Sequence, residues 1–156
     1  MTLAERPTVR MLVIDDLDRL LLIGELEDDG IRRYWITPGG GIEPSETVDQ
    51  AARREMFEET GLVTFELGPL IWTRQFTSYV EGQHFHTEER VHLVRVSAFE
   101  ATTSGFTELE LASNLELQWW TLDALRTTID RFAPRELPGI VAMVLNDCLP
   151  DLPIEL

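Results

Sequence analysis

Three glutamates at helical spacing are the residues of this chain best suited to do chemistry. Glu55, Glu58 and Glu59 stand at positions i, i+3 and i+4, so their carboxylates share one face if the segment is a helix. Carboxylates crowded in this way repel one another, but Mg²⁺ or Mn²⁺ takes oxygen ligands and would neutralise the cluster. Arg54 can orient one of the carboxylates through a forked, charge-assisted bond. The spacing therefore indicates a metal site, and a solvated acidic helix face is the alternative.

The surrounding segment has the signals of a helix that follows a glycine loop. Ser45 or Thr47 can cap the first turn, and Gly61 can end the helix in a left-handed conformation. The Pro-Gly-Gly-Gly run at 38–41 disfavours a strand and predicts a loop that leads into the helix. An apolar stripe at helical spacing runs through residues 47–60 and consists of Val48, Ala51, Ala52 and Met56.

The segment from Gly40 to Leu62 resembles the signature of the Nudix hydrolase family at every specified position. The signature has the form G-x5-E-x7-R-E-U-x-E-E-x-G-U with U apolar, and the chain reads GGIEPSETVDQAARREMFEETGL. A chance match in a chain of this length has odds on the order of 10⁻⁸ at average residue frequencies. The resemblance implies an α/β fold, a Nudix-type α/β/α sandwich with a mixed β-sheet. It also implies an enzyme that hydrolyses a diphosphate linkage with the help of Mg²⁺ or Mn²⁺.

The resemblance assigns roles to the matched residues. The glutamates that correspond to Glu55, Glu58 and Glu59 bind the divalent metals that bridge a substrate diphosphate. The residue matching Arg54 orients the carboxylate matching Glu55, and the residue matching Glu46 stabilises the loop and the helix. A metal-activated water then attacks one phosphorus of a P–O–P linkage. Its proton passes to Glu55 or to a glutamate downstream of the signature.

Two further metal ligands are expected outside the matched glutamates. The resemblance implies a backbone carbonyl of the glycine loop, most simply that of Gly39. Some family members also use a carboxylate just before a tryptophan-containing strand, which is expected here at 115–120. Glu116 is the nearest carboxylate, with Glu110 and Glu108 further upstream. Period-two alternation allows Glu116 to point toward the site, and a surface position on an edge strand is the alternative.

Aromatic and basic residues outside the signature can select the rest of the substrate, which the resemblance implies is a nucleoside diphosphate linked to another moiety. Arg74, Phe76 and Tyr79 are the expected substrate-binding residues, because an aromatic ring can stack on a base and an arginine can pair with a phosphate. The alternative is that these three side chains pack in the core or face solvent without binding a substrate. A Nudix-fold ligand-binding or regulatory protein without hydrolase activity is the alternative function, although the intact glutamates argue against it.

Composition limits the remaining possibilities. The 156 residues most simply form one domain, 1–156, and no apolar run approaches the ~20 residues of a membrane span. The lone Cys148 and the lack of a signal peptide fit a cytoplasmic protein. The formal net charge of −15 makes nucleic acid an unfavourable partner, yet a polyphosphate can arrive with its charge screened by Mg²⁺. The resemblance also favours a homodimer weakly.

The other elements follow from hydrophobic periodicity and turn residues. Strands interleaved with helices imply an α/β sandwich with a mixed sheet. The expected strands are 9–14 and 20–24 as a hairpin, 34–36, 69–76, 84–96 and 115–120, and the expected helices after the signature are 122–132 and 137–148.

Overall fold

One mixed sheet organises the part of the chain that the computed structural model describes, residues 2–112 and 115–156. Its order is β8-β3-β2-β1-β6-β5-β9, with β4 added beside β1 and β7 beside β2. The β1–β6, β3–β8 and β5–β9 pairs are parallel and the others antiparallel, so the mixed sheet is confirmed. The strands are β1 (Ala4–Asp15), β2 (Leu20–Leu26), β3 (Arg33–Ile36), β4 (Gly39–Gly41), β5 (Leu70–Val80), β6 (Gln83–Val96), β7 (Glu116–Trp120), β8 (Arg131–Ala133) and β9 (Ile154–Glu155).

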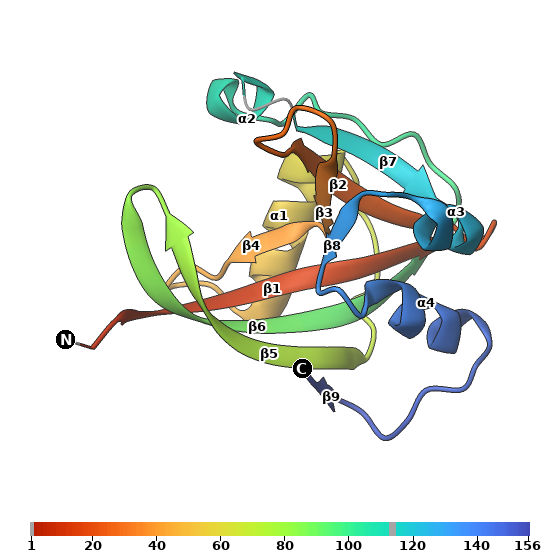
Figure 1. Cartoon of the computed structure of the whole chain (residues 1–156). Helices are drawn as coiled ribbons and strands as arrows, with labels where there is room; N and C mark the ends of the chain where they lie inside the picture. Colours follow the sequence, from red (N-terminus) through yellow and green to blue (C-terminus); the bar gives the residue numbers. More distant parts are fainter. Residues whose placement is uncertain (1, 113–114) are drawn as a thin grey trace.

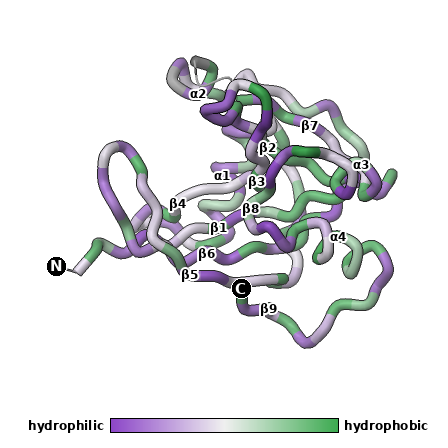
Figure 2. Tube along the Cα trace, viewed as in Figure 1, coloured by the Kyte–Doolittle hydropathy of each residue, from purple (hydrophilic) through white to green (hydrophobic). Residues whose placement is uncertain are grey.

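Helices cover both faces of the sheet, which confirms the predicted sandwich (Figure 1). Val9, Met11 and Val13 of β1 pack with α1 on one face. Leu12 and Ile14 point the other way and pack with α3 and α4, because successive strand side chains alternate. Figure 2 shows hydrophobic stretches in the strands at the centre of the sheet and in α4. The helices are α1 (Val48–Thr60), α2 (Glu108–Ala112), α3 (Leu122–Thr127) and α4 (Leu137–Leu145).

Helix α1 begins and ends where the sequence predicts. Thr47 is the cap: its hydroxyl accepts the N–H of Gln50 at 3.1 Å, and the Gln50 side chain accepts the N–H of Thr47 at 2.9 Å. Gly61 has φ 80° and its N–H donates to the carbonyl of Phe57 at 3.0 Å. The register of the glutamates on α1 is therefore fixed locally, by the sequence of the helix and its two caps.

The glycine run was predicted to be a loop, and this prediction is wrong. Gly39–Gly41 forms the short strand β4, which pairs antiparallel with residues 8–10 of β1. The reason is space, because a Cβ at Gly39 would lie 2.2 Å from the carbonyl oxygen of Val9. Residues without side chains can approach the backbone of β1 this closely and pair with it, which a residue with a side chain at position 39 could not do.

The predicted helix 122–132 is also wrong in its second half. Helix α3 ends at Thr127, and the chain continues into β8, which pairs parallel with β3. Asp130 anchors this turn, because its carboxylate accepts the backbone N–H of Arg33 and the indole N–H of Trp35, each at 2.9 Å. These contacts join residues about a hundred positions apart, so no local pattern could predict them.

The last predicted helix, 137–148, ends at Leu145, and Cys148 lies beyond it on the surface. Helix α2 and strand β9 were not predicted. Within residues 2–112 and 115–156, no helix combines the length and the apolar character that crossing a membrane requires.

Gly24 provides a test of the packing of the sheet. A Cβ there would lie 2.5 Å from Cζ3 of Trp35, a ring that packs edge-on against Trp120. We expect Gly24→Ala to lower the free energy of unfolding by about 1–3 kcal/mol, the usual cost of overpacking. Gly139→Ala in α4 is the matched control, because a Cβ there meets nothing within 4 Å. Urea unfolding should show the loss in the first variant alone; equal stability of both would contradict this packing.

Candidate active site at helix α1 and strand β4

The carboxylates of α1 lie directly against the glycine strand. A Cβ at Gly40 would lie 2.5 Å from Oε1 of Glu55, so a side chain there would displace that carboxylate from its present position. The backbone N–H of Gly39 donates to Oε2 of Glu59 at 3.2 Å. Gly39 has φ 143°, a conformation that side chains disfavour. The structure therefore brings together the glycine strand and two of the three predicted glutamates.

Arg54 ties this group together. Its Nε and Nη2 each donate to Glu46 at 2.8 Å, which is a bidentate pair. Its Nη1 donates to Oε1 of Glu55 at 2.9 Å, and Nη2 also donates to the carbonyl of Gly41 at 2.9 Å. Hydrogen bonding to Arg54 lowers the pKa of Glu46 to about 2, and the pKa of Arg54 is raised in turn. One guanidinium thus joins the helix, the strand and the loop between them.

Glu58 and Glu59 both bind protons more tightly than an ordinary glutamate. Burial raises the pKa of Glu59 well above its ordinary value of 4.5, Glu55 raises it further, and the charge of Arg10 opposes the shift. Burial and Glu55 also raise the pKa of Glu58, whose side chain remains 50% exposed and 3.5 Å from Nη1 of Arg54. Arg54 and Arg10 therefore do not fully offset the burial and mutual repulsion of the α1 carboxylates.

These residues fit a hard divalent cation. The available donors are carboxylate and carbonyl oxygens, which Mg²⁺ and Mn²⁺ prefer. A cation would favour the charged carboxylates and so oppose the burial and the charge of Glu55 that raise both pKa values. In the described ranges no three ionisable side chains already form a coordination shell. Arg54 contacts both Glu55 and Glu58 here, so binding an ion would require these side chains to turn toward it.

The fold places the two downstream carboxylates, Glu116 and Glu110, on different elements. Glu116 lies on β7 opposite Gly24, and its Oε1 pairs with Nε of Arg33 at 3.2 Å. The charge of Glu110, in α2, contributes to the raised pKa of Glu58, although burial and the charge of Glu55 are the larger causes. The place of Glu116 in a metal site stays a prediction, and Glu110 joins it as a candidate.

A second charged group lies on β6 and its neighbours, and sequence reasoning missed its centre. Glu89 is 1% exposed and pairs with Arg10 of β1 and Arg74 of β5. Period-two alternation along the expected strand 84–96 could have found it, because Glu89 falls on the same buried face as Val91 and Leu93. Arg74 and Phe76, two predicted substrate-binding residues, line a cavity that Glu89 and Arg10 also line.

Tyr79, the third predicted substrate-binding residue, lies elsewhere. The β5–β6 hairpin extends away from the sheet as an arched ribbon, and Tyr79 stands near its tip with 66% of its surface exposed (Figure 1). Its ring packs against His84 with centroids 4.9 Å apart. The structure therefore separates Tyr79 from Arg74 and Phe76.

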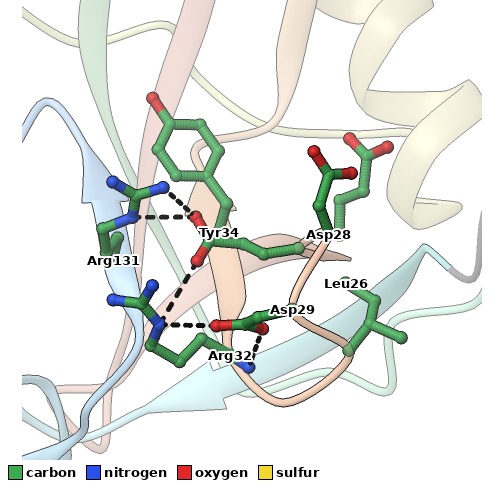
Figure 3. Close-up of a pocket in the computed structure, with 8 residues that line it drawn as sticks. Leu26, Asp28, Asp29, Arg32, Tyr34 and Arg131 are labelled. Atoms are coloured by element: carbon green, nitrogen blue, oxygen red, sulfur yellow. Dashed lines mark hydrogen bonds and ion pairs between the residues drawn. The ribbon is translucent and has the colours of Figure 1, made fainter.

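Another cavity, of about 320 Å³, lies where the β2–β3 hairpin meets β8 (Figure 3). Asp29 accepts a 2.8 Å bond from Nε of Arg32, which lowers the pKa of Asp29 to about 2, and Glu27 pairs with Arg131. These acidic side chains thus have arginine partners within the protein, which is typical of a structural ion-pair network.

Comparison with known proteins extends the match beyond the glutamate segment. The family profile described as the NUDIX domain matches residues 4–140. The chain belongs to the NUDIX family. The NUDIX profile thus covers strands β1 to β8 as well as α1, in agreement with the resemblance drawn from the sequence.

Named relatives match over a shorter stretch of this NUDIX protein. The chain is 42% identical over 67 residues to Nudix hydrolase 19, chloroplastic, of Arabidopsis thaliana, which is 42% of this chain and 14% of that protein. It is 36% identical over 72 residues to the RNA pyrophosphohydrolase of Brucella ovis, again 42% of this chain and 40% of that protein. The E. coli dihydroneopterin triphosphate pyrophosphohydrolase shares the fold, with TM-score 0.62 at 18% identity over 90% of this chain and 95% of that one.

The raised pKa of Glu59 makes a prediction about the metal-free protein. Above pH ~4.5 the folded state holds a proton that the unfolded chain releases, so this group lowers stability as the pH rises. In EDTA we expect Glu59→Gln to be more stable than wild type by about 0.5–2 kcal/mol at pH 8. The advantage should shrink at pH 5. Urea unfolding at both pH values measures this difference in stability. A variant less stable than wild type at pH 8 would contradict the raised pKa of Glu59.

Proposed function

We propose that this NUDIX protein is a Mg²⁺- or Mn²⁺-dependent hydrolase of a P–O–P linkage, in which a nucleoside diphosphate is linked to another moiety. The observation that supports the proposal most directly is the packing of the α1 carboxylates against the glycine strand, tied by Arg54. Glu55, Glu58 and Glu59 are the proposed metal ligands, with the carbonyl of Gly39. The expected cytoplasmic location and homodimer stay predictions.

The side chains have distinct proposed tasks. When bound, a divalent cation lowers the pKa of a bound water and neutralises charge on a diphosphate. Glu59, hydrogen-bonded to Gly39, holds its carboxylate at the inner end of the site. Arg54 keeps Glu55 close to the glycine strand, and Glu58 faces solvent, where a substrate can reach it. Two pyrophosphohydrolases among the similar proteins support this class of reaction without naming this chain's substrate.

The first experiment measures phosphate or nucleotide release from a panel of nucleoside triphosphates, dinucleoside polyphosphates, nucleotide sugars and short RNA 5′ ends. Each compound is tested with Mg²⁺, with Mn²⁺ and with EDTA. Release that requires the metal supports the hydrolase. Metal binding without release from any compound would favour the alternative, a ligand-binding or regulatory protein.

Glu58 provides the direct test of the metal site. We expect Glu58→Gln to lower kcat/KM by about 10²–10⁴-fold, because one anionic ligand of the metal is lost. Its exposure predicts that the fold survives the change. Asp49→Asn is the matched control, because Asp49 lies on the same helix but pairs with Arg53 in the first turn. Undiminished activity of Glu58→Gln would remove the metal-site assignment.

A second pair of variants separates the downstream carboxylates. We expect Glu110→Gln to raise the metal concentration needed for half-maximal activity, because the charge of Glu110 reaches Glu58. Glu116→Gln should leave that concentration unchanged if its ion pair with Arg33 is its only role. A metal activation curve for each variant makes the comparison. The reverse result would restore Glu116 as the ligand that the sequence suggested.

A further inference from the structure

Glu89 is a buried carboxylate held between two arginines from different strands. Its Oε1 lies 3.2 Å from Nε of Arg10 and 3.3 Å from Nη2 of Arg74, and its Oε2 accepts from Nε of Arg74. The indole N–H of Trp72 lies 3.4 Å from Oε2. Two guanidiniums and one carboxylate leave one net positive charge, inside a chain whose formal net charge is −15. This is a place where an anion would be favoured.

The two arginines face a cavity with aromatic walls. The cavity has about 150 Å³ and is lined by Arg10, Arg74, Glu89, Tyr34, Ile36, Phe76 and Ala133. It adjoins a cavity of about 390 Å³ that shares Tyr34, Arg74 and Phe76 with it. The guanidinium of Arg74 lies over the Phe76 ring, 4.5 Å from its centroid. Aromatic rings and arginine planes are the surfaces on which nucleobases stack.

Arg10 connects this cavity with the candidate active site. Its Cα lies 2.5 Å from the place a Cβ of Gly39 would occupy, and its Nη1 donates to the carbonyl of Thr37 at 2.7 Å. Its charge also reaches Glu59. A molecule bound by the carboxylates of α1 therefore has the cavity within reach.

We propose that Glu89 is a positioning residue that holds Arg10 and Arg74 so that the cavity binds the nucleoside monophosphate part of the substrate. The guanidiniums bind its phosphate, and Tyr34 and Phe76 contact the base. Each guanidinium carries five N–H donors, more than its contacts with Glu89 and Thr37 use, so donors are left for a phosphate. Without the carboxylate the two cations would repel and separate. This inference rests on the proposed function, since it names the substrate class of that site.

The test is binding of AMP, GMP, CMP and UMP to the whole protein by calorimetry in EDTA, so that neither metal nor hydrolysis is needed. Ribose 5-phosphate is the probe without a base. We expect at least one nucleoside monophosphate to bind more tightly than ribose 5-phosphate, and Glu89→Gln to weaken it by about 10–100-fold. Glu88→Gln is the matched control, because Glu88 is the neighbouring residue of β6 and is exposed. It should bind like wild type.

Arg74→Lys keeps the positive charge but loses the planar guanidinium with its paired N–H donors. It replaces Glu89→Gln as the test variant if circular dichroism shows that Glu89→Gln does not fold. With a hydrolysed substrate, either variant should raise KM about tenfold and leave kcat within about threefold, which a general loss of structure would not do. Unchanged monophosphate binding in both variants would overturn the inference. So would an absence of binding in a wild type that hydrolyses diphosphates, and the proposed function would then stand alone. Binding that needs Glu89, in a protein without metal-dependent hydrolysis, would support the binding role and overturn the proposed function.

Discussion

The candidate active site depends on the hydrogen bonds that the guanidinium of Arg54 donates to its neighbours. Three carboxylates on one helix face repel one another, and a helix alone offers nothing to oppose this. Arg54 binds Glu46 bidentately, Glu55 through one bond and the carbonyl of Gly41 through another. A single cation thereby compensates part of the repulsion and joins three segments of the chain. The pKa values of Glu58 and Glu59 stay raised, first through burial and then through the charge of Glu55.

The second constraint is the close approach of strand β4 to both β1 and α1. Strand β4 pairs with β1 in the sheet, and a side chain at Gly39 or Gly40 would collide with Val9 or Glu55. Glycine at position 39 lets the strand pair with β1, and glycine at position 40 leaves the Glu55 carboxylate in its present place. The apolar packing of Ala51, Ala52 and Met56 on the sheet holds this arrangement from the far side of the helix.

Charge is distributed unevenly over the molecule, and the two proposed binding regions use it in opposite ways. The carboxylates of α1 carry negative charge that a cation would neutralise. The cavity at Arg10 and Arg74 instead has a surplus positive charge around the buried Glu89. A substrate with a metal-bound diphosphate and an aromatic base meets both needs. Arg10, which contacts the chain next to the glycine strand and also pairs with Glu89, stands between the two.

The sequence by itself determined the site on α1, because every signal for it is local. Helix spacing, the Thr47 cap and Gly61 fix the glutamates on one face, and their residue types define the chemistry. Single residues of the cavity, Arg74 and Phe76, could also be predicted. Tertiary structure alone decided the rest. Glu89 becomes a buried partner of two arginines only when β1 and β5 pair with β6 on either side of it. Asp130 holds the end of a predicted helix in place beside β3 through its contacts with Arg33 and Trp35. Burial and ion pairing depend on residues distant in the chain, and no local periodicity records which strands become neighbours.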